Sequence, residues 1–225
     1  MPNDIRTKAI VLRRTNFGEA DRIINFLTEQ GVVACIAKGV RKEKSKLAGS
    51  VELFTLSEIT VHEGRNNKLG VLTSAKMLEH YQNIVYKLPE LELASTIMKK
   101  IAAVAENSTG PEYFDLLKQV LAALNAGVNP ELVETWFWFN FARVGGEQIN
   151  LVRDVSGAKL DPFLSYVWDA TESALCERRG GNVSAKEIKL MRLMLASDLK
   201  TTSRVSDVAS SLPTLLYIAK TINKQ

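Results

Sequence analysis

The hydrophobic residues of the first 80 positions form short runs that are separated by turn signals. The runs are rich in β-branched and aliphatic residues and are followed by turns containing Gly or Asn, a pattern typical of β-strands. Partial alternation within 51–63 puts Leu53, Ile59 and Val61 on one face. The pattern predicts strands over residues 7–15, 21–28, 32–40, 51–63 and 69–79. Short strands joined by tight turns favour a small barrel or sandwich.

Beyond position 88 the hydrophobic residues recur at intervals of three and four, the spacing of an amphipathic helix. Helices are expected over residues 89–106, 112–127, 129–146, 184–199 and 206–224. Ser184 and Glu187 form a capping box before the fourth helix, and Pro213 either kinks or divides the fifth. Aromatic residues in 136–141 would surround the third helix on all sides, which favours core packing over base stacking.

Strands followed by helices, without alternation, predict an α+β chain. We expect a five-stranded barrel domain over residues 1–80 and a mainly α-helical domain over residues 81–225. Within the second, the stretch of about 147–183 has no clear period and is expected to be an irregular insertion.

Composition limits the class of protein. The chain has 225 residues, 46% of them hydrophobic and 24% charged, so it can bury a core without disulfide or metal staples. No apolar window approaches the roughly 18–20 residues that cross a bilayer, and early charged residues argue against a signal peptide. Cys35 and Cys176 lie far apart without metal-type spacing, which favours free thiols in a reducing cytoplasm.

The net charge of +4 is unevenly distributed along the chain. Residues 1–80 contain 13 Lys and Arg against 9 Asp and Glu, whereas residues 81–225 contain 16 of each kind. The first segment therefore carries the whole excess, and its densest part is the segment "CIAKGVRKEKSKLAG" at 35–49. An asymmetry of this kind indicates a polyanion as partner.

Two interpretations of the basic segment stay open: a solvated turn, or a surface that faces phosphates. Its place after a barrel strand favours the second, because oligonucleotide/oligosaccharide-binding (OB) folds carry their binding elements there. Phe17 and Phe54 are the nearest aromatic residues that could stack on bases. Binding would be non-specific and strongly salt-dependent. The candidate DNA-binding residues are Arg13, Arg14, Lys38, Arg41, Lys42, Lys44, Lys46, Arg65 and Lys68.

Motifs of enzymatic chemistry are weak. The chain has no nucleophile elbow, phosphate-binding glycine loop or dinucleotide fingerprint, and His62 and His80 lie near no nucleophile motif. Glu19 and Asp21 could serve a metal-dependent nuclease, but an ion pair with the adjacent Arg22 is favoured. We therefore expect no catalytic residue, no cofactor and no small-molecule substrate.

The segment "AIVLRRTNFGEADRIINFLTEQGVVACIAKGVRKEKSKLAG" (9–49) resembles the N-terminal segment of the bacterial RecO family of recombinational-repair proteins. The run VLR-x-x-NFGEADRI carries most of the likeness, and "LFTLSEITVHEGRNNKLGVLTSAKMLE" (53–79) extends it. The resemblance is fairly specific over about the first 80 residues, and the remainder is similar mainly in layout.

The resemblance implies an OB-fold domain followed by a helical domain, without catalytic turnover. RecO-like proteins bind single- and double-stranded DNA and promote annealing of complementary strands. With RecR they help load RecA recombinase onto DNA coated by single-stranded-DNA-binding protein (SSB), and they contact its acidic C-terminal tail. These roles imply a cytoplasmic, nucleoid-associated protein with no membrane partner. By position, the resemblance implies DNA contact by Arg13, Arg14, Lys38, Arg41, Lys42, Lys44 and Lys46, and a structural role for Glu19, Asp21 and Arg22.

One departure from the family concerns zinc. Many members have a cysteine-rich zinc-binding insertion, but residues 150–182 contain only Cys176, and no histidine follows His80. Because tetrahedral zinc needs four ligands, we expect no metal here. The segment would be held instead by packing of Leu160, Phe163, Tyr166 and Trp168.

The contacts with protein partners stay open in the sequence. The cations Arg178, Arg179, Lys186, Lys189 and Arg192 are either solvated surface or contacts for an acidic tail. The main alternative function is a protein–protein interaction adaptor whose basic face docks an acidic partner.

Overall fold

The computed structural model describes residues 4–64, 69–106 and 110–223 of the chain. The chain forms two compact units, residues 1–125 and 126–225. The first contains a β-barrel and two long helices, and the second contains further helices and a small sheet.

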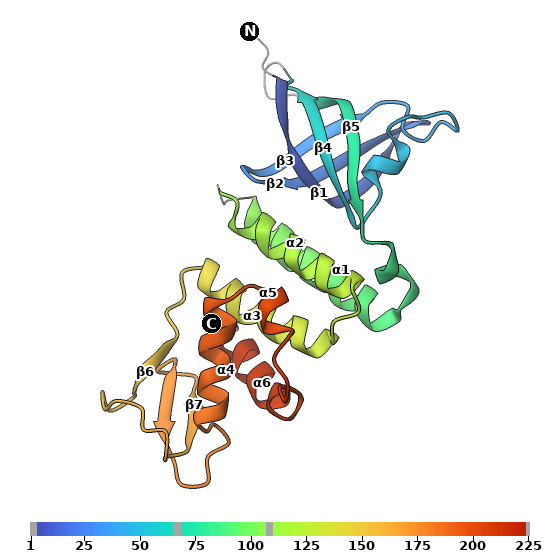
Figure 1. Ribbon diagram of the computed structural model, residues 1–225. Helices are drawn as coiled ribbons and strands as arrows, with labels where there is room; N and C mark the ends of the chain where they lie inside the picture. The colour runs from blue at the N-terminus through green and yellow to red at the C-terminus, as the bar shows by residue number, and fades with distance from the viewer. Residues whose placement is uncertain (1–3, 65–68, 107–109, 224–225) are drawn as a thin grey trace. The chain divides into compact units, whose positions relative to one another are not determined.

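The barrel of the first unit closes through strand β1 (Asp4–Phe17), which pairs with both of its neighbours. The other strands are β2 (Asp21–Thr28), β3 (Gly31–Ala37), β4 (Thr55–His62) and β5 (Gly70–His80). Their order around the barrel is β1-β2-β3-β5-β4 (Figure 1). Only the pair of β3 and β5 is parallel among the described barrel strands. The predicted five-stranded OB-fold barrel is confirmed.

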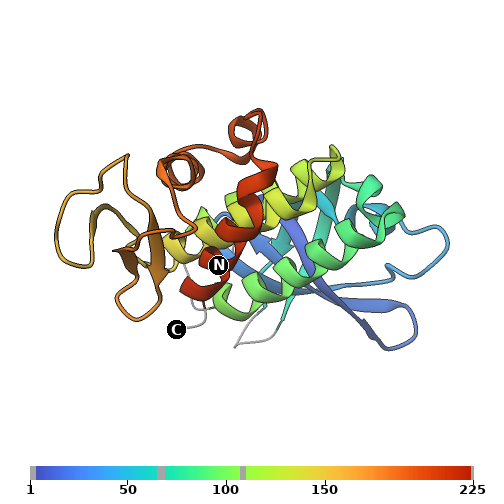
Figure 2. The same cartoon turned by 90° about the horizontal axis from the view of Figure 1, so that it is seen from below.

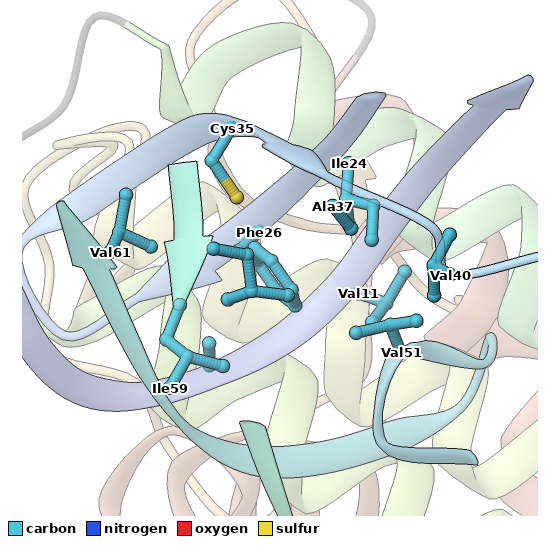
Figure 3. Packing of buried hydrophobic residues seen from close by; sticks show 11 residues of the cluster. Val11, Ile24, Phe26, Cys35, Ala37, Val40, Val51, Ile59 and Val61 are labelled. Carbon is cyan, nitrogen blue, oxygen red and sulfur yellow. The ribbon is translucent and has the colours of Figure 1, made fainter. Parts of the chain in front are cut away.

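Alternation along the strands builds the barrel core. Successive strand residues point to opposite faces, so every second residue enters the barrel. Figure 3 shows the resulting cluster, in which Phe26 of β2 and Cys35 of β3 are fully buried. Burial raises the pKa of the Cys35 thiol to about 12, because the interior disfavours the thiolate.

The connection from β3 to β4 departs from the predicted strand over 51–63. It contains a short 3-10 helix, η1 (Ala48–Val51), so β4 begins only at Thr55. Ser50 fixes η1 to the barrel: its carbonyl accepts a 2.7 Å hydrogen bond from the Ser57 hydroxyl, and its own hydroxyl accepts a 3.1 Å bond from the Met77 amide.

A 3-10 helix, η2 (Gln82–Tyr86), leads from the barrel to α1 (Leu88–Ala105) and α2 (Glu112–Asn125). Figures 1 and 2 show α1 and α2 side by side, and both contact β1. The change from strand to helix lies at 80/81 as expected, but the compact unit extends to Asn125. A domain boundary at 80/81 therefore stays a prediction.

The second unit is built around α3 (Pro130–Val144). Asn129 caps this helix, since its side-chain oxygen accepts from the amides of Glu131 and Leu132. Trp136 is buried and its indole donates a 3.1 Å bond to the Ser197 carbonyl. The predicted core role of the aromatic segment is confirmed.

The stretch 147–183 is less irregular than predicted. It forms a three-stranded sheet of β6 (Asn150–Asp154), β8 (Ala174–Glu177) and β7 (Tyr166–Asp169), in that order. Tyr166 is buried as expected, and its hydroxyl accepts a 2.8 Å bond from the Asp161 amide. The expected packing of Phe163 is wrong, because its side chain is 94% exposed. Leu160 and Trp168 are half-buried.

The remaining elements are α4 (Ala185–Ala196), α5 (Leu199–Thr202), η3 (Ala209–Ser211) and α6 (Leu212–Ile222). The predicted capping box of Ser184 and Glu187 is present at the start of α4. Pro213 neither kinks nor divides a long helix; it lies in the first turn of α6, where its missing amide hydrogen costs no helical bond. In the described part of the chain, no helix is both long and apolar enough to span a bilayer.

Candidate nucleic-acid interface

The basic loop, residues 38–46, follows β3 and leads toward η1. Apolar residues anchor both sides of it: Val40 is only 2% exposed within the barrel core, and Leu47 packs against that core. The cationic side chains extend outward instead and are all exposed, namely Lys38, Arg41, Lys42, Lys44 and Lys46. The sequence therefore produces a loop with an apolar inner side and a cationic outer side.

The β1–β2 turn holds the basic loop in place. The Gly39 amide donates a 2.6 Å hydrogen bond to Oδ1 of Asp21, and the Arg41 amide donates a 2.9 Å bond to the Ala20 carbonyl. The Arg41 guanidinium also donates to the Gly18 carbonyl at 3.3 Å. Figures 1 and 2 show the loop and this turn projecting at the same end of the barrel.

Hydrogen bonds inside the basic loop also limit its conformations. The Lys42 amide donates to the Gly39 carbonyl at 3.1 Å, and the Ser45 amide donates to the Lys42 carbonyl at 3.0 Å. Gly39 has a φ of 62°, in the left-handed region that glycine adopts without a steric penalty. The loop is thus a series of defined turns, so the backbone positions from which its cations extend are defined.

None of the five loop cations forms an ion pair with a carboxylate among the residues that the structure describes. Their charge is therefore available to an anion in solution. A set of exposed, uncompensated cations is the feature that phosphate backbones recognise.

Arg14 differs from the loop cations. Only 21% of its side chain is exposed, and its guanidinium forms an ion pair with Glu52. The same carboxylate contacts Nη1 of Arg22 at 3.4 Å. The predicted ion pair of Arg22 with Glu19 or Asp21 is wrong, because Arg22 pairs with Glu52, which lies 30 residues along the chain. One carboxylate thus compensates two of the cations near this end of β1.

Arg13 lies in yet another environment. It is exposed and lines a groove of about 560 Å³ in the first unit, together with Leu53, Phe54, Met98 and Lys99. Because adjacent strand residues point to opposite faces, Arg13 and Arg14 cannot share one surface. Two further predicted cations, Arg65 and Lys68, lie outside the described residues.

The structure separates the two aromatic candidates for base stacking. Phe17 is 51% exposed at the end of β1, directly before the turn that holds the basic loop. Phe54 is only 3% exposed. A ring buried to that extent cannot offer its face to a base, so Phe17 alone of this pair remains a candidate.

The two carboxylates proposed for a nuclease have different surroundings. Glu19 is exposed in the β1–β2 turn, whereas the Asp21 carboxylate accepts the Gly39 amide. Across the described residues, no group of three or more His, Cys, Asp and Glu lies close enough to hold a metal ion.

Some cations of the second unit form hydrogen bonds within that unit, and others are exposed. Lys186 donates a 2.8 Å bond to Asp207, and Arg192 donates to the Leu151 carbonyl. Both therefore serve packing within the unit. By contrast, Arg178, Arg179 and Lys189 are exposed.

Comparison with known families finds one family model for an N-terminal part of the chain and another for a C-terminal part. The family model "Recombination protein O N terminal" matches residues 1–81, and "Recombination protein O C terminal" matches residues 96–222. The chain belongs to the RecO family. The expected family membership is thereby confirmed, and with it the assignment to DNA repair and recombination proteins.

Individual relatives agree with this assignment. A protein of Dehalococcoides mccartyi strain CBDB1 named "DNA repair protein RecO" is 30% identical over 213 residues, covering 91% of this chain and 83% of the relative. One of the same name from Roseiflexus sp. strain RS-1 is 30% identical over 203 residues, covering 87% and 71%. The similarity thus extends well beyond the barrel, into the second unit.

Proposed function

We propose that this RecO-family chain is a non-enzymatic recombination mediator that binds single- and double-stranded DNA through its basic loop. The observation that carries the proposal is the set of five exposed cations, fixed by hydrogen bonds to the β1–β2 turn and not compensated by carboxylates of the described chain. The proposed role requires no catalytic residue, no metal or cofactor and no small-molecule substrate.

Charge neutralisation explains how such a loop would act. Each phosphate that meets a Lys or Arg releases a condensed counterion, so the binding energy is largely electrostatic and falls with salt. Contacts of this kind carry no information on base sequence. A protein that neutralises the backbones of two complementary strands lowers their repulsion and so promotes annealing.

Family membership supports a proposal for the partners of this role. With RecR, the chain would help load RecA recombinase onto SSB-coated DNA in the cytoplasm, at the nucleoid. The acidic C-terminal tail of SSB needs a cationic docking surface, and Arg178, Arg179 and Lys189 of the second unit are exposed for such a contact.

The first experiment measures binding of an unstructured fluorescent oligonucleotide by anisotropy across a salt series. Changing Arg41, Lys42, Lys44 and Lys46 to Ala should weaken binding by more than about tenfold at low salt. The salt slope should fall by up to about 3, since each phosphate contact on a single strand contributes about 0.7.

A matched control tests whether position, and not only charge, matters. The Lys8→Ala/Lys76→Ala variant removes two exposed cations from the barrel wall, and Lys42→Ala/Lys44→Ala removes two from the loop. We expect Lys42→Ala/Lys44→Ala to lower the salt slope of DNA binding and Lys8→Ala/Lys76→Ala to leave it unchanged. If the fourfold loop variant binds DNA like the wild type but fails to bind an acidic partner, the chain is an interaction adaptor instead.

A further inference from the structure

We propose that the ring of Phe17 is a base-stacking platform, which strengthens the binding of single-stranded relative to double-stranded nucleic acid at this end of the barrel. The inference rests on the proposed function of the neighbouring basic loop and names the residue that would distinguish its single-stranded from its double-stranded ligand. It names one aromatic side chain as the group that contacts bases, beside cations that contact phosphates.

The exposure of Phe17 sets it apart from the other phenylalanines of the barrel. Phe26 is fully buried and Phe54 is 3% exposed, but Phe17 is 51% exposed. A single exposed apolar residue is common in proteins and needs no function by itself. Its significance here comes from what surrounds it.

The residues next to Phe17 in the turn form hydrogen bonds to the basic loop. Phe17 is the strand partner of Asp21, whose carboxylate accepts the Gly39 amide at 2.6 Å. The next residue, Gly18, accepts from the Arg41 guanidinium at 3.3 Å. The backbone of Phe17 is therefore joined to the basic loop through its strand partner Asp21 and its neighbour Gly18.

An aromatic ring beside cations matches the two chemical parts of a nucleotide. The cations take the phosphate, and the ring takes the face of the base, which every base offers whatever its sequence. Bases in a duplex are already stacked and paired, so their faces are not available without unstacking. The ring should thus stabilise complexes with single strands only.

The test compares Phe17→Ala with the wild type on an oligothymidylate and on a duplex of equal length. We expect binding to the single strand to weaken by about fivefold to tenfold, or roughly 1–1.4 kcal/mol. Duplex binding should change by less than about twofold, and the salt slope should stay the same because no phosphate contact is lost. Tyr86→Ala is the matched control, as that ring is 78% exposed in η2.

Two more substitutions separate stacking from a structural role. Phe17→Leu keeps the apolar bulk without an aromatic face, and we expect it to bind the single strand as weakly as Phe17→Ala. Phe17→Trp should restore binding. Its indole fluorescence should be quenched on addition of oligothymidylate, whereas the native Trp136, Trp138 and Trp168, none of them exposed, should respond little. Thermal unfolding of each variant verifies that it is folded.

The outcomes distinguish this inference from the proposed function. The stacking role would be overturned if Phe17→Ala lost the same affinity for the single strand and the duplex. It would also be overturned if Phe17→Leu bound the single strand like the wild type. If Phe17→Ala binds the single strand like the wild type and the fourfold loop variant loses binding, the stacking role is overturned. The basic loop then remains the DNA-binding surface. Wild-type binding by the fourfold loop variant overturns the proposed function itself, and the stacking role falls with it.

Discussion

At the residue scale, the position of the basic loop depends on Asp21. Its carboxylate at first sight could serve as a metal ligand, yet it accepts the Gly39 amide at 2.6 Å. A hydrogen bond to a charged group is among the stronger polar contacts. Asp21 therefore positions the loop, and any effect of this residue on the proposed DNA binding would be indirect.

We expect Asp21→Ala to lower the free energy of unfolding by about 1.5 kcal/mol, because it removes a charge-assisted hydrogen bond. Trypsin should also cleave the loop several times faster, since its Lys and Arg bonds become more mobile. Urea unfolding and mass spectrometry of the fragments measure the two effects. Glu19→Ala, at the neighbouring exposed carboxylate, should change neither; an equal effect of both variants would contradict the positioning role.

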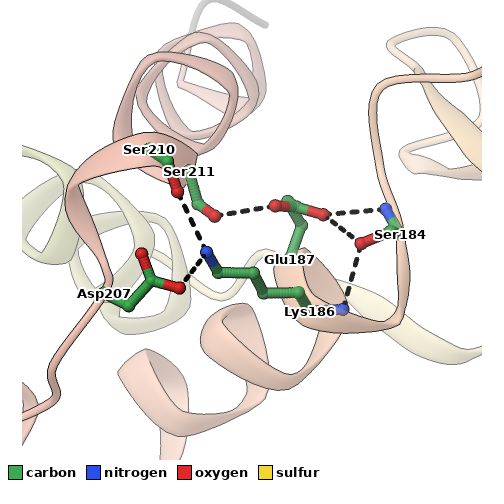
Figure 4. Close-up of polar contacts among 6 residues, drawn as sticks. All are labelled: Ser184, Lys186, Glu187, Asp207, Ser210 and Ser211. Atoms are coloured by element: carbon green, nitrogen blue, oxygen red, sulfur yellow. Dashed lines mark hydrogen bonds and ion pairs between the residues drawn. The ribbon is translucent and has the colours of Figure 1, made fainter.

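At the element scale, one carboxylate joins the starts of two helices in the second unit. Figure 4 shows Glu187 of α4 accepting from the amide and hydroxyl of Ser184 and, at 2.7 Å, from the hydroxyl of Ser211. Lys186 contacts Asp207 and Ser210 from the same turn. The network connects the N-terminus of α4 to the segment that precedes α6.

The network leads to a pH prediction. Burial alone would raise the pKa of Glu187, but the hydrogen bonds from Ser184 and Ser211 outweigh it and leave the pKa below its ordinary value of 4.5. The carboxylate therefore stabilises the fold above about pH 4.5, and that stabilisation is lost as the pH falls through the lowered pKa.

Glu187→Gln should accordingly cost about 1–2 kcal/mol at pH 7, because an amide cannot accept all three bonds. The difference from the wild type should shrink as the pH falls below about 4.5. Urea unfolding of both proteins at several pH values measures this difference in the free energy of unfolding. Glu172→Gln, which makes the same change at an exposed side chain, is the control variant. A difference that is independent of pH would contradict the assigned role of the carboxylate.

At the scale of the whole molecule, charge divides the chain. Residues 1–80 carry a net charge of +4 (13 minus 9) and residues 81–225 a net charge of zero (16 minus 16). Long-range attraction of a polyanion should therefore be directed to the barrel. In the second unit itself, residues 126–225, 12 Lys and Arg are nearly balanced by 11 Asp and Glu.

We expect a variant with four exposed cations of the second unit changed to Ala to keep the oligonucleotide affinity and salt slope of the wild type. The four are Lys159, Arg178, Arg179 and Lys189. The same variant should bind an acidic peptide more weakly, if the second unit docks the SSB tail as proposed. Anisotropy titrations with both ligands test this, and a loss of DNA affinity equal to that of the fourfold loop variant would contradict the division.

Much of this architecture follows from the sequence alone. Runs of β-branched and aliphatic residues bounded by turn residues predicted the barrel strands, with β2 correct at both ends, because strand composition and turn chemistry are local. The same holds for the α4 capping box and for the buried aromatic helix α3. The loop cations were predicted by their density, since a run of like charges has to be solvated or bound.

What the sequence left open concerns contacts between distant residues. In the sequence, Arg13 and Arg14 are adjacent candidates for DNA contact, but adjacent residues of a strand point to opposite faces. The charge of Arg14 is moreover compensated by Glu52, which is distant in the sequence. Phe17 and Phe54 were equivalent candidates until packing buried one of them. Local pattern determines which elements form, whereas exposure and charge compensation depend on how the barrel closes, and so only the tertiary structure decides them.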